Sequence, residues 1–226
     1  MNYIEAKKYI NQLASKEIKL GLERIIYFMD KIGNPQNKLK VIHIAGTNGK
    51  GSVGELIASI YAYSGLYVGR YVSPAVFHER ETIRFYANDS EDKVSTSYIS
   101  EEEVINFVEI LQTVNNIDLS VFEIETGMAF YTFLSRKCDL VIIETGMGGR
   151  LDATNITQNT ICEVITSISK DHESFLGNSL TKIAIEKCGI IKKNSFVVTG
   201  YQQEEVMEVI RSTCDKMNAN LEIANM

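Results

Sequence analysis

The stretch VIHIAGTNGKGSVGELIASIY, residues 41–61, decides how the rest of the chain is interpreted. The apolar run at residues 40–45 predicts a buried strand, and the pattern at residues 52–64 predicts a helix. Between them, Gly46, Gly49 and Gly51 surround Lys50. Glycines let backbone N–H groups turn toward an anion, a helix N-terminus adds partial positive charge, and a lysine reaches terminal phosphates. The stretch therefore predicts a phosphate-binding loop.

The spacing of this loop differs from the common G-x-x-x-x-G-K-[ST] pattern. Gly51 separates Lys50 from the hydroxyl group of Ser52, and the first glycine lies closer to the lysine. Glycine-rich turns between a strand and a helix also occur as purely structural features of α/β folds. A structural turn is therefore the alternative interpretation, although the lysine beside the glycines favours a nucleotide.

Outward from this stretch, strands alternate with helices over nearly the whole chain. Further strands are predicted at residues 66–72, 140–144, 162–167 and 196–199, with a short extended piece at 82–86. Helices are predicted at residues 4–13, 22–29, 100–114, 125–136, 179–187 and 204–217. Ser100 is the expected N-cap of its helix, and residues 87–97 are interpreted as a polar linker. The alternation predicts an α/β fold with a doubly wound, mostly parallel sheet.

The composition favours one globular domain. The chain has 226 residues and a formal net charge of −6, and it lacks a Lys/Arg-dense stretch. This argues against nucleic acid as a partner, because phosphate-backbone binding depends on many basic contacts. The N-terminus lacks the apolar core of a signal peptide, and no run reaches the roughly 18 apolar residues of a membrane span. We expect a cytoplasmic protein that does not bind membranes and whose four cysteines are reduced structural thiols.

Five stretches carry a resemblance to a known family. GTNGKGS after a strand resembles the variant P-loop of the Mur ligase superfamily, and the other four are similar to folylpolyglutamate synthase and dihydrofolate synthase. These four are KLGLERI (19–25), FEIETGMAF (122–130), ETGMGGRLDATN (144–155) and KDHESFLGNSLTKIAIEKCGIIK (170–192). They occur in the family's order and cover most of the chain.

The resemblance implies an ATP-dependent amide ligase with a central-domain-like Mur ligase fold. ATP would phosphorylate a carboxylate of dihydropteroate or of a reduced folate, and the amine of L-glutamate would then attack the acyl phosphate. Phosphoryl transfer depends on positioning and on neutralising negative charge, which a lysine and Mg²⁺ provide.

The resemblance also assigns roles to residues of the loop and of the metal sites. It implies that ATP is bound by Gly46, Thr47, Asn48, Gly49, Lys50, Gly51 and Ser52. Ser73 and Glu144 are implied as ligands of a first Mg²⁺, and His172 as the ligand of a second. Lys187 matches a lysine that is carbamylated in relatives. The catalytic set is then Lys50, Glu144, His172 and Lys187.

Each of the last three residues also has a simpler interpretation. Glu144 ends an apolar strand, so it would otherwise be an ordinary solvated carboxylate. His172 would be a loop histidine, and an unmodified Lys187 would be a surface ammonium on a helix.

Three further groups of residues resemble edges of the family's pterin site. They are Gly21, Leu22 and Arg24; Phe122, Glu123 and Glu125; and Arg150, Leu151 and Asp152. Phe122 suits stacking on a flat ring, but an apolar residue at a helix start is as often a packing residue. His43, inside the first strand, is interpreted as a core histidine, and His78 is left without a role. Ala75 stands where the family usually has histidine, which puts the substrate contacts of that loop in doubt.

The length of the chain leaves alternatives to the ligase hypothesis. Family members carry a second, C-terminal domain that contributes to the glutamate site, and residues 1–226 correspond to the N-terminal, ATP-binding part alone. One alternative is therefore a truncated domain that binds nucleotide or pterin without catalysis. Another is a different Mur-type ligase, which would have no use for the FEIET and KLGLERI stretches.

Overall fold

The computed structural model describes residues 1–14, 21–90, 93–115, 118–171 and 177–224. Their centre is an eight-stranded sheet with the order β4-β3-β2-β5-β1-β6-β7-β8. The strands are β1 (Val41–Ala45), β2 (Val68–Tyr71), β3 (Ile83–Ser90), β4 (Lys93–Tyr98), β5 (Leu140–Glu144), β6 (Thr160–Ile165), β7 (Phe196–Gly200) and β8 (Asn220–Ala224). The pairs from β2 to β8 are parallel, whereas β3 and β4 pair antiparallel at one edge. The predicted mostly parallel sheet is confirmed.

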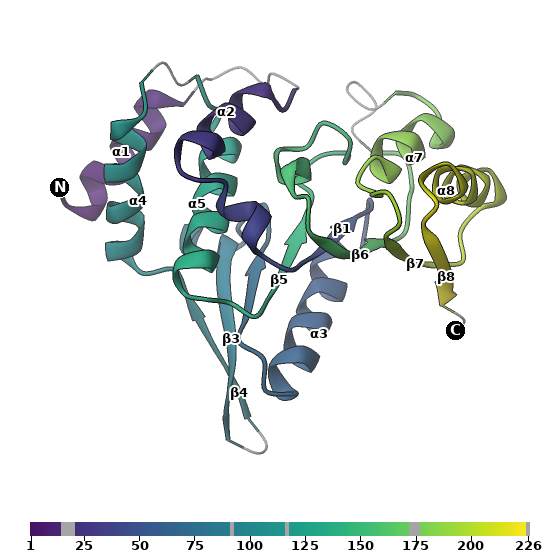
Figure 1. Cartoon of the computed structure of the whole chain (residues 1–226), viewed down its shortest axis with the longest axis horizontal. Helices are drawn as coiled ribbons and strands as arrows, with labels where there is room; N and C mark the ends of the chain where they lie inside the picture. The colour runs from purple at the N-terminus through teal and green to yellow at the C-terminus, as the bar shows by residue number, and fades with distance from the viewer. Residues whose placement is uncertain (15–20, 91–92, 116–117, 172–176, 225–226) are drawn as a thin grey trace.

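Helices cover both faces of the sheet (Figure 1). They are α1 (Tyr3–Leu13), α2 (Glu23–Lys31), α3 (Lys50–Tyr63), α4 (Glu101–Thr113), α5 (Val121–Ser135), α7 (Leu180–Cys188) and α8 (Glu204–Met217). Short 3-10 turns are η1 (Pro35–Lys38), η2 (Glu79–Thr82) and η3 (Ala153–Ile156). Ser100 caps α4 as predicted, since its hydroxyl accepts the Glu103 N–H. Ser120 caps α5 in the same way.

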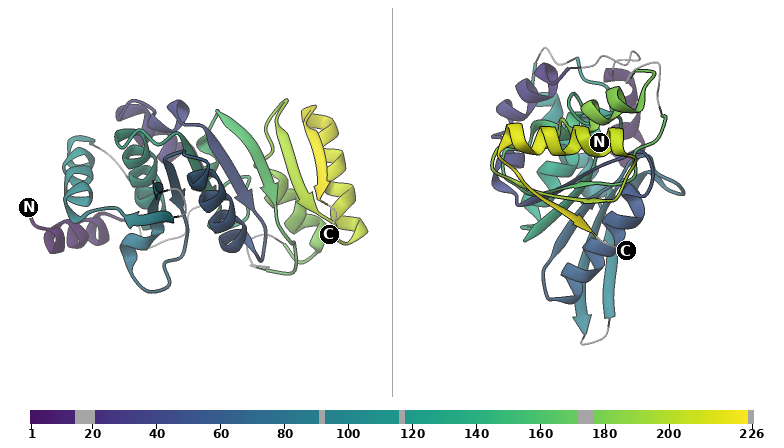
Figure 2. Two further views of the ribbon diagram at one scale, coloured as in Figure 1. Left: turned by 90° about the horizontal axis from the view of Figure 1, so that it is seen from below. Right: turned by 90° about the vertical axis from the view of Figure 1, so that its right-hand side faces the viewer.

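Alternate residues along the central strands enter different hydrophobic cores. In β1, Ile42 and Ile44 pack toward α3. Val41 faces the core that contains α1, α2, α4 and α5, and Ala45 faces the core of α7 and α8. This alternation follows from the two-residue period of a strand. Figure 2 shows the layers from two further sides, with α8 beside β7 and β8 at the end of the molecule opposite the N-terminus.

Two segments differ from the expectations. Residues 87–97 are not a linker, because most of them belong to the antiparallel hairpin β3–β4. Most residues of β4 are exposed at the edge of the sheet, so polar residues suffice there and apolar periodicity is weak. Near the C-terminus, Asn220–Ala224 forms the edge strand β8 against β7.

The helix predicted at residues 125–136 begins earlier, at Val121. Its first turn is fixed by Ser120, whose hydroxyl accepts the Glu123 N–H. Within the described ranges, no helix is both long and apolar enough to cross a lipid bilayer. The four cysteines are all free thiols, as predicted.

Candidate nucleotide and metal site

The loop between β1 and α3 lies against the end of β6. Gly46 has a φ of 157°, and a Cβ at this position would lie 1.8 Å from Thr166 Oγ1. Any side chain at residue 46 would therefore displace the loop from β6. Gly49, the N-cap of α3, has a left-handed φ of 86°. The glycines thus serve the close approach and the turn that the sequence predicted.

The segment after β6 holds the first half of the loop. The backbone N–H groups of Thr47 and Asn48 both donate to Ser167 O, at 2.8 and 3.3 Å. Thr47 Oγ1 donates to Ser169 O at 3.0 Å, and the Ser169 N–H donates back to the same hydroxyl. Ser167 Oγ donates to Asn48 O at 3.2 Å. Residues 46–48 are therefore fixed before any ligand binds.

The second half of the loop opens α3 and carries unused donors. The first N–H groups of a helix have no partner within the helix, and Gly49 has no side chain that could cap them. Together with the helix dipole, these N–H groups favour an anion at this end of α3. The geometry therefore fits a phosphate group.

Lys50 and Lys187 approach the same carbonyl oxygen of the loop. Lys50 Nζ donates to Gly46 O at 3.1 Å, and Lys187 Nζ donates to Gly46 O at 2.7 Å. Lys187 is only 2% exposed, so its interpretation as a surface ammonium was wrong. Helix α7 packs inward, and burial together with the nearby Lys50 charge lowers the pKa of Lys187 to about 8. The amine therefore has a substantial neutral fraction at mildly alkaline pH.

Glu144 lies at the end of β5 next to Ser73. Its Oε1 accepts the Ser73 N–H at 2.9 Å, whereas its Oε2 is buried without a hydrogen-bond partner. Burial raises the pKa of Glu144. Because the side chain is buried, the simpler interpretation of an ordinary solvated carboxylate was wrong. An unpartnered buried carboxylate oxygen beside a serine fits a hard divalent cation, which prefers oxygen ligands.

The remaining predicted metal ligand is His172. His172 lies outside the described residues, so the expected second metal site stays a prediction. Within the described part of the chain, no three His, Cys, Asp or Glu side chains are arranged to hold a metal ion. A cation at Glu144 would therefore depend on the Ser73 hydroxyl, nucleotide phosphates and water, which is a usual arrangement for Mg²⁺.

The residues predicted for the pterin site come together in part. Arg24, in the first turn of α2, forms an ion pair with Glu123, with Nη2 3.1 Å from Oε1. Gly21 and Leu22 precede this turn. The structure thus joins the first predicted group to the start of α5, at residues about a hundred positions apart in the sequence.

Phe122 connects α5 to the loop after β5. Its ring lies 6.2 Å from that of Tyr71, and a Cβ at Gly146 would lie 2.6 Å from Phe122 Cζ. In the same loop, Asp152 is buried: its Oδ2 accepts the Met147 N–H and its Oδ1 accepts from Thr154. Arg150 Nη2 contacts Glu186 Oε1 at 2.9 Å, and Leu151 is half-buried. Asp152 therefore shapes the loop through its own carboxylate.

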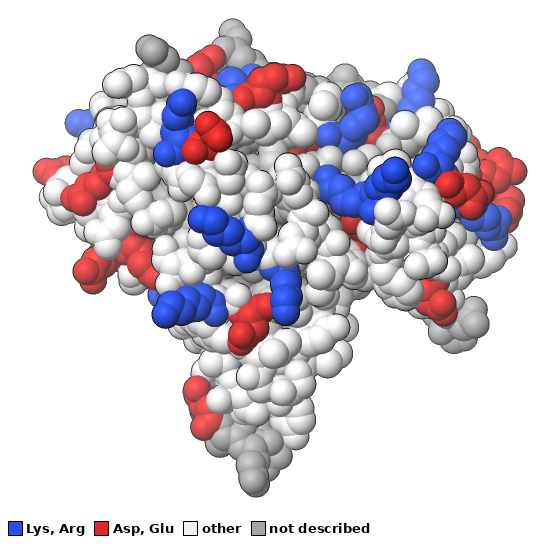
Figure 3. Space-filling view, viewed as in Figure 1, with Lys and Arg blue, Asp and Glu red and all other residues white. Residues whose placement is uncertain are grey.

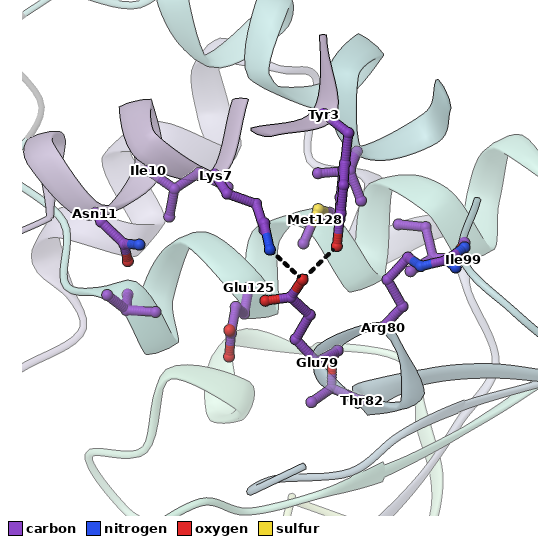
Figure 4. A pocket seen from close by; sticks show the side chains of 12 residues that line it. Tyr3, Lys7, Ile10, Asn11, Glu79, Arg80, Thr82, Ile99, Glu125 and Met128 are labelled. Atoms are coloured by element: carbon purple, nitrogen blue, oxygen red, sulfur yellow. Dashed lines mark hydrogen bonds and ion pairs between the residues drawn. The ribbon is translucent and has the colours of Figure 1, made fainter. Parts of the chain in front are cut away.

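Glu125, unlike Phe122 and Glu123, lines a pocket between α1, α4, α5 and η2 (Figure 4). In this pocket, Glu79 Oε1 accepts from Tyr3 Oη and from Lys7 Nζ, both at 2.7 Å. Burial, followed by the negative charge of Glu79, raises the pKa of Glu125 to about 7. Of the three residues predicted at the start of α5, Glu125 is the one that lines this pocket.

His43 is a core residue, as predicted. It is fully buried in β1, and its Nε2 lies 2.8 Å from Thr154 Oγ1. Because that hydroxyl donates to Asp152 Oδ1, His43 Nε2 is the donor in the pair. Burial and the Lys192 charge lower the pKa of His43 to about 3, so the imidazole is neutral. His78 caps η2 by accepting the Arg80 N–H.

Sequence reasoning missed Arg70 and the serines after β6. Arg70 is a charged residue in the short, otherwise uncharged strand β2, and this placement could have indicated a buried functional side chain. Its Nη2 donates to Gly51 O at 2.7 Å. Ser167 and Ser169 had no signal, because their contacts with Thr47 and Asn48 join positions about 120 apart. On the face in Figure 3, positive and negative side chains are interspersed.

Comparisons with known proteins give consistent similarities. A dihydrofolate synthetase of Saccharomyces cerevisiae is 37% identical over 215 residues, covering 92% of this chain and 48% of that protein. A dihydrofolate synthase/folylpolyglutamate synthase of Bacillus subtilis is 37% identical, covering 95% of this chain and 49% of that protein. No family model matches the chain.

A solved structure is also similar. The folylpolyglutamate synthase of Mycobacterium tuberculosis, complexed with ADP and AMPPCP, matches with a TM-score of 0.81 and 33% identity. The match covers 98% of this chain and 49% of that one. The chain spans about half the length of the curated relatives it matches.

Proposed function

Because the chain belongs to the folylpolyglutamate synthase and dihydrofolate synthase family, we propose that it acts in ATP-dependent amide formation. The acceptor is dihydropteroate or a reduced folate, and the amine is L-glutamate. The observation that carries the proposal is the loop at residues 46–52. It presents helix N–H groups beside Lys50, and the unpartnered Oε2 of Glu144 lies 3.8 Å from the position that a Cβ of Gly51 would occupy. The relative from Mycobacterium tuberculosis was solved with ADP and AMPPCP, which supports ATP as the nucleotide.

The reaction has two steps. A carboxylate oxygen of the acceptor attacks the γ-phosphorus of ATP, the bond to the β–γ bridging oxygen breaks, and ADP leaves. The glutamate amine then attacks the acyl carbon, phosphate leaves with the bonding electrons, and the nitrogen loses a proton. The first step needs charge neutralisation around the phosphates, because negative charge spreads over their oxygens in the transition state.

This chain's own residues supply that neutralisation. In the proposal, the N–H groups of the first turn of α3 bind phosphate oxygens, and Lys50 turns from Gly46 O toward the β- and γ-phosphates. Glu144 and the Ser73 hydroxyl hold a magnesium ion, and His172 is assigned to a second. When bound, Mg²⁺ draws negative charge from the phosphate oxygens and orients them.

Lys187 is proposed as the carbamylated residue. A carbamate forms when the neutral amine attacks CO₂ and loses a proton, so a lysine pKa of about 8 favours the modification. The product would carry a negative charge near Lys50, which removes the repulsion between the buried Lys187 ammonium and the half-buried Lys50 ammonium. A carbamate at this position would also add oxygen ligands near the metal site.

The acceptor is proposed to bind around the start of α5. Arg24 and Glu123 form one side through their ion pair, and Phe122 lies between Tyr71 and the loop at residues 146–152. Phe122, Gly21, Leu22, Arg150 and Leu151 are proposed to contact the acceptor directly. Asp152 would act by fixing the loop, because both of its oxygens already accept hydrogen bonds.

The test is ADP release by the purified chain with magnesium-ATP and L-glutamate. One series supplies dihydropteroate and the other supplies tetrahydrofolate. We expect release that requires both the pterin and glutamate, and the active series identifies the acceptor. Lys50→Met should abolish it, whereas Lys38→Met, which removes an exposed lysine elsewhere, should not.

Two results would contradict the proposal. Nucleotide binding without release in either series would favour the non-catalytic binding module. Uridine nucleotide binding in preference to ADP would favour another Mur-type ligase.

A further inference from the structure

Strand β2 places a buried positive charge beneath the proposed nucleotide loop. The Arg70 side chain is 4% exposed, and its Nη2 donates to Gly51 O at 2.7 Å. Its Nη1 donates to Glu55 Oε2 at 2.5 Å and to Tyr86 Oη at 3.2 Å. Tyr86 Oη in turn donates to Glu55 Oε2 at 2.8 Å. The guanidinium is therefore held on several sides, as a buried cation must be.

Helix α3 is shaped to admit this side chain. A Cβ at Gly54 would lie 3.1 Å from Arg70 Nε, which is tighter than ordinary contact. The glycine thus lets the first turns of α3 approach the guanidinium closely. Glu55, the next residue, supplies the neutralising carboxylate. The neighbouring pair Gly54-Glu55 and the distant Arg70 form one packing unit.

Arg70 also lies close to the proposed metal ligand. Arg70 Nη2 and Glu144 Oε2 lie 3.7 and 3.8 Å from one point, the position that a Cβ of Gly51 would occupy. The guanidinium and the Glu144 carboxylate therefore both face Gly51 at the start of α3. A cation at a helix N-terminus is ordinarily unfavourable, because the helix dipole is already positive there. Its burial at this end adds to the potential that attracts an anion.

We infer that Arg70 is a positioning residue of the nucleotide site. By binding the Gly51 carbonyl, it holds the first turn of α3 so that the N–H on the other side of that planar peptide, from Ser52, points toward the phosphates. Its charge also favours phosphate and opposes a divalent cation at Glu144. The inference rests on the proposed nucleotide function of this loop.

The geometry of the peptide unit gives the physical reason. The C=O and N–H groups of a trans peptide point in opposite directions within one plane. A fixed Gly51 carbonyl therefore fixes the Ser52 N–H. A charge-assisted hydrogen bond holds this orientation more strongly than a neutral one does.

The test is the dissociation constant of ADP, measured by titration calorimetry with EDTA and then with magnesium. For Arg70→Met, we expect metal-free ADP binding to weaken about tenfold, which is the size of one favourable charged contact. The factor by which magnesium improves ADP binding should rise, because a charge that opposes the cation is gone. A simple loss of folded protein would not produce opposite changes in these two quantities.

Two further variants separate the inference from general effects. Arg84→Met is the matched control, because it also removes an arginine charge beside Glu55: Arg84 Nη1, from β3, lies 3.6 Å from Glu55 Oε2. Arg84 does not bond the Gly51 carbonyl, so this variant should change the dissociation constant of metal-free ADP less than twofold. Glu55→Gln keeps the guanidinium and removes its counter-charge, so metal-free ADP should bind equally well or up to about threefold more tightly. Glu55→Gln tests the inference even where Arg70→Met fails to fold.

The outcomes are distinguishable. Wild-type protein that binds no ADP would overturn the proposed function, and the inference with it. Wild-type binding with an unchanged metal-free constant in Arg70→Met would overturn the inference alone. Equal weakening with and without magnesium, or weaker metal-free binding in Glu55→Gln, would also overturn it.

Discussion

At the scale of single residues, the site combines charges that ordinarily avoid burial. Lys50 and Lys187 share one carbonyl oxygen, and Glu144 keeps one oxygen without a partner. Leaving a buried polar atom unpaired costs about 1 to 3 kcal/mol, more when it is charged. Such arrangements concentrate at functional sites, because a ligand completes them. The bound nucleotide and cation would supply the missing partners.

Glu144→Gln should separate metal binding from nucleotide binding. The amide keeps the size of the side chain and loses the charge that attracts Mg²⁺. We expect metal-free ADP affinity to stay equal or improve, while the gain from adding magnesium falls by about tenfold or more. Titration calorimetry of Glu144→Gln and of the wild type, each with EDTA and with magnesium, measures the two ADP affinities. A magnesium gain equal to that of the wild type would exclude Glu144 as the ligand.

Glu125→Gln should change how stability depends on pH. The pKa of Glu125 is raised to about 7 by burial, so the folded state binds its proton more tightly than the unfolded state does. Stability contributed by the protonated form is present at acidic pH and is lost as pH rises from about 4.5 to about 7. The variant should therefore be more stable than the wild type at pH 8, by roughly 1 to 3 kcal/mol, and similar to it near pH 4.

Urea unfolding at several pH values measures the difference. Glu208→Gln, on the exposed side of α8, is the matched control and should show no such trend. A stability difference for Glu125→Gln that is constant from pH 4 to pH 8 would contradict the prediction.

At the scale of elements, the loop after β1 and the segment after β6 form one unit. Six hydrogen bonds between residues 47–48 and 167–169 join them, and Gly46 lets the two segments touch. Preorganised N–H groups lose less entropy on binding an anion than a mobile loop would. The packing of β6 against β1 therefore contributes directly to the proposed phosphate site.

Gly46→Ala should disrupt this unit. The added Cβ would overlap Thr166, so we expect a loss of about 2 to 4 kcal/mol in the free energy of unfolding, together with weaker ADP binding. Gly65→Ala is the matched control: Gly65 also has a positive φ, of 97°, but no atom lies within 4 Å of the added Cβ. It should cost only about 1 kcal/mol and leave ADP binding unchanged. Equal costs for the two variants would contradict the steric argument.

At the scale of the whole molecule, the parallel strands collect the site at one edge of the sheet. The loop after β1, Ser73 after β2, Glu144 at the end of β5 and the serines after β6 all follow carboxyl ends of strands. In open α/β sheets this edge binds ligands, at the point where the strand order reverses. The core on both faces of β1 keeps these ends in register.

A ligand at this edge should stabilise the whole fold. Binding to the folded state alone adds about 2.7 kcal/mol at a ligand concentration of 100 times the dissociation constant. For a chain of this size, that corresponds to a rise in Tm of roughly 5 to 10 °C. Differential scanning fluorimetry with magnesium-ADP measures the shift, and Lys50→Met should reduce it. An unchanged Tm in the wild type would argue against nucleotide binding.

Much of this architecture could be predicted from local sequence. The apolar periods and the turn residues place most strands and helices within a few residues, and the glycine spacing around Lys50 identifies the loop. The hairpin β3–β4 and the edge strand β8 escaped, because a solvent-exposed edge strand needs no apolar alternation. Hydrophobic patterning detects elements only where they contribute a buried face.

The sequence by itself determined the fold class, the glycine-rich loop around Lys50 and the family resemblance, since each depends on residues close together along the chain. Only the tertiary structure showed that Lys187 is buried beside Lys50, that Arg70 packs against the start of α3, and that Glu125 lines a pocket with Glu79. These relations join residues that lie far apart along the chain. They follow from how the sheet and its helices pack, and no local pattern records such packing.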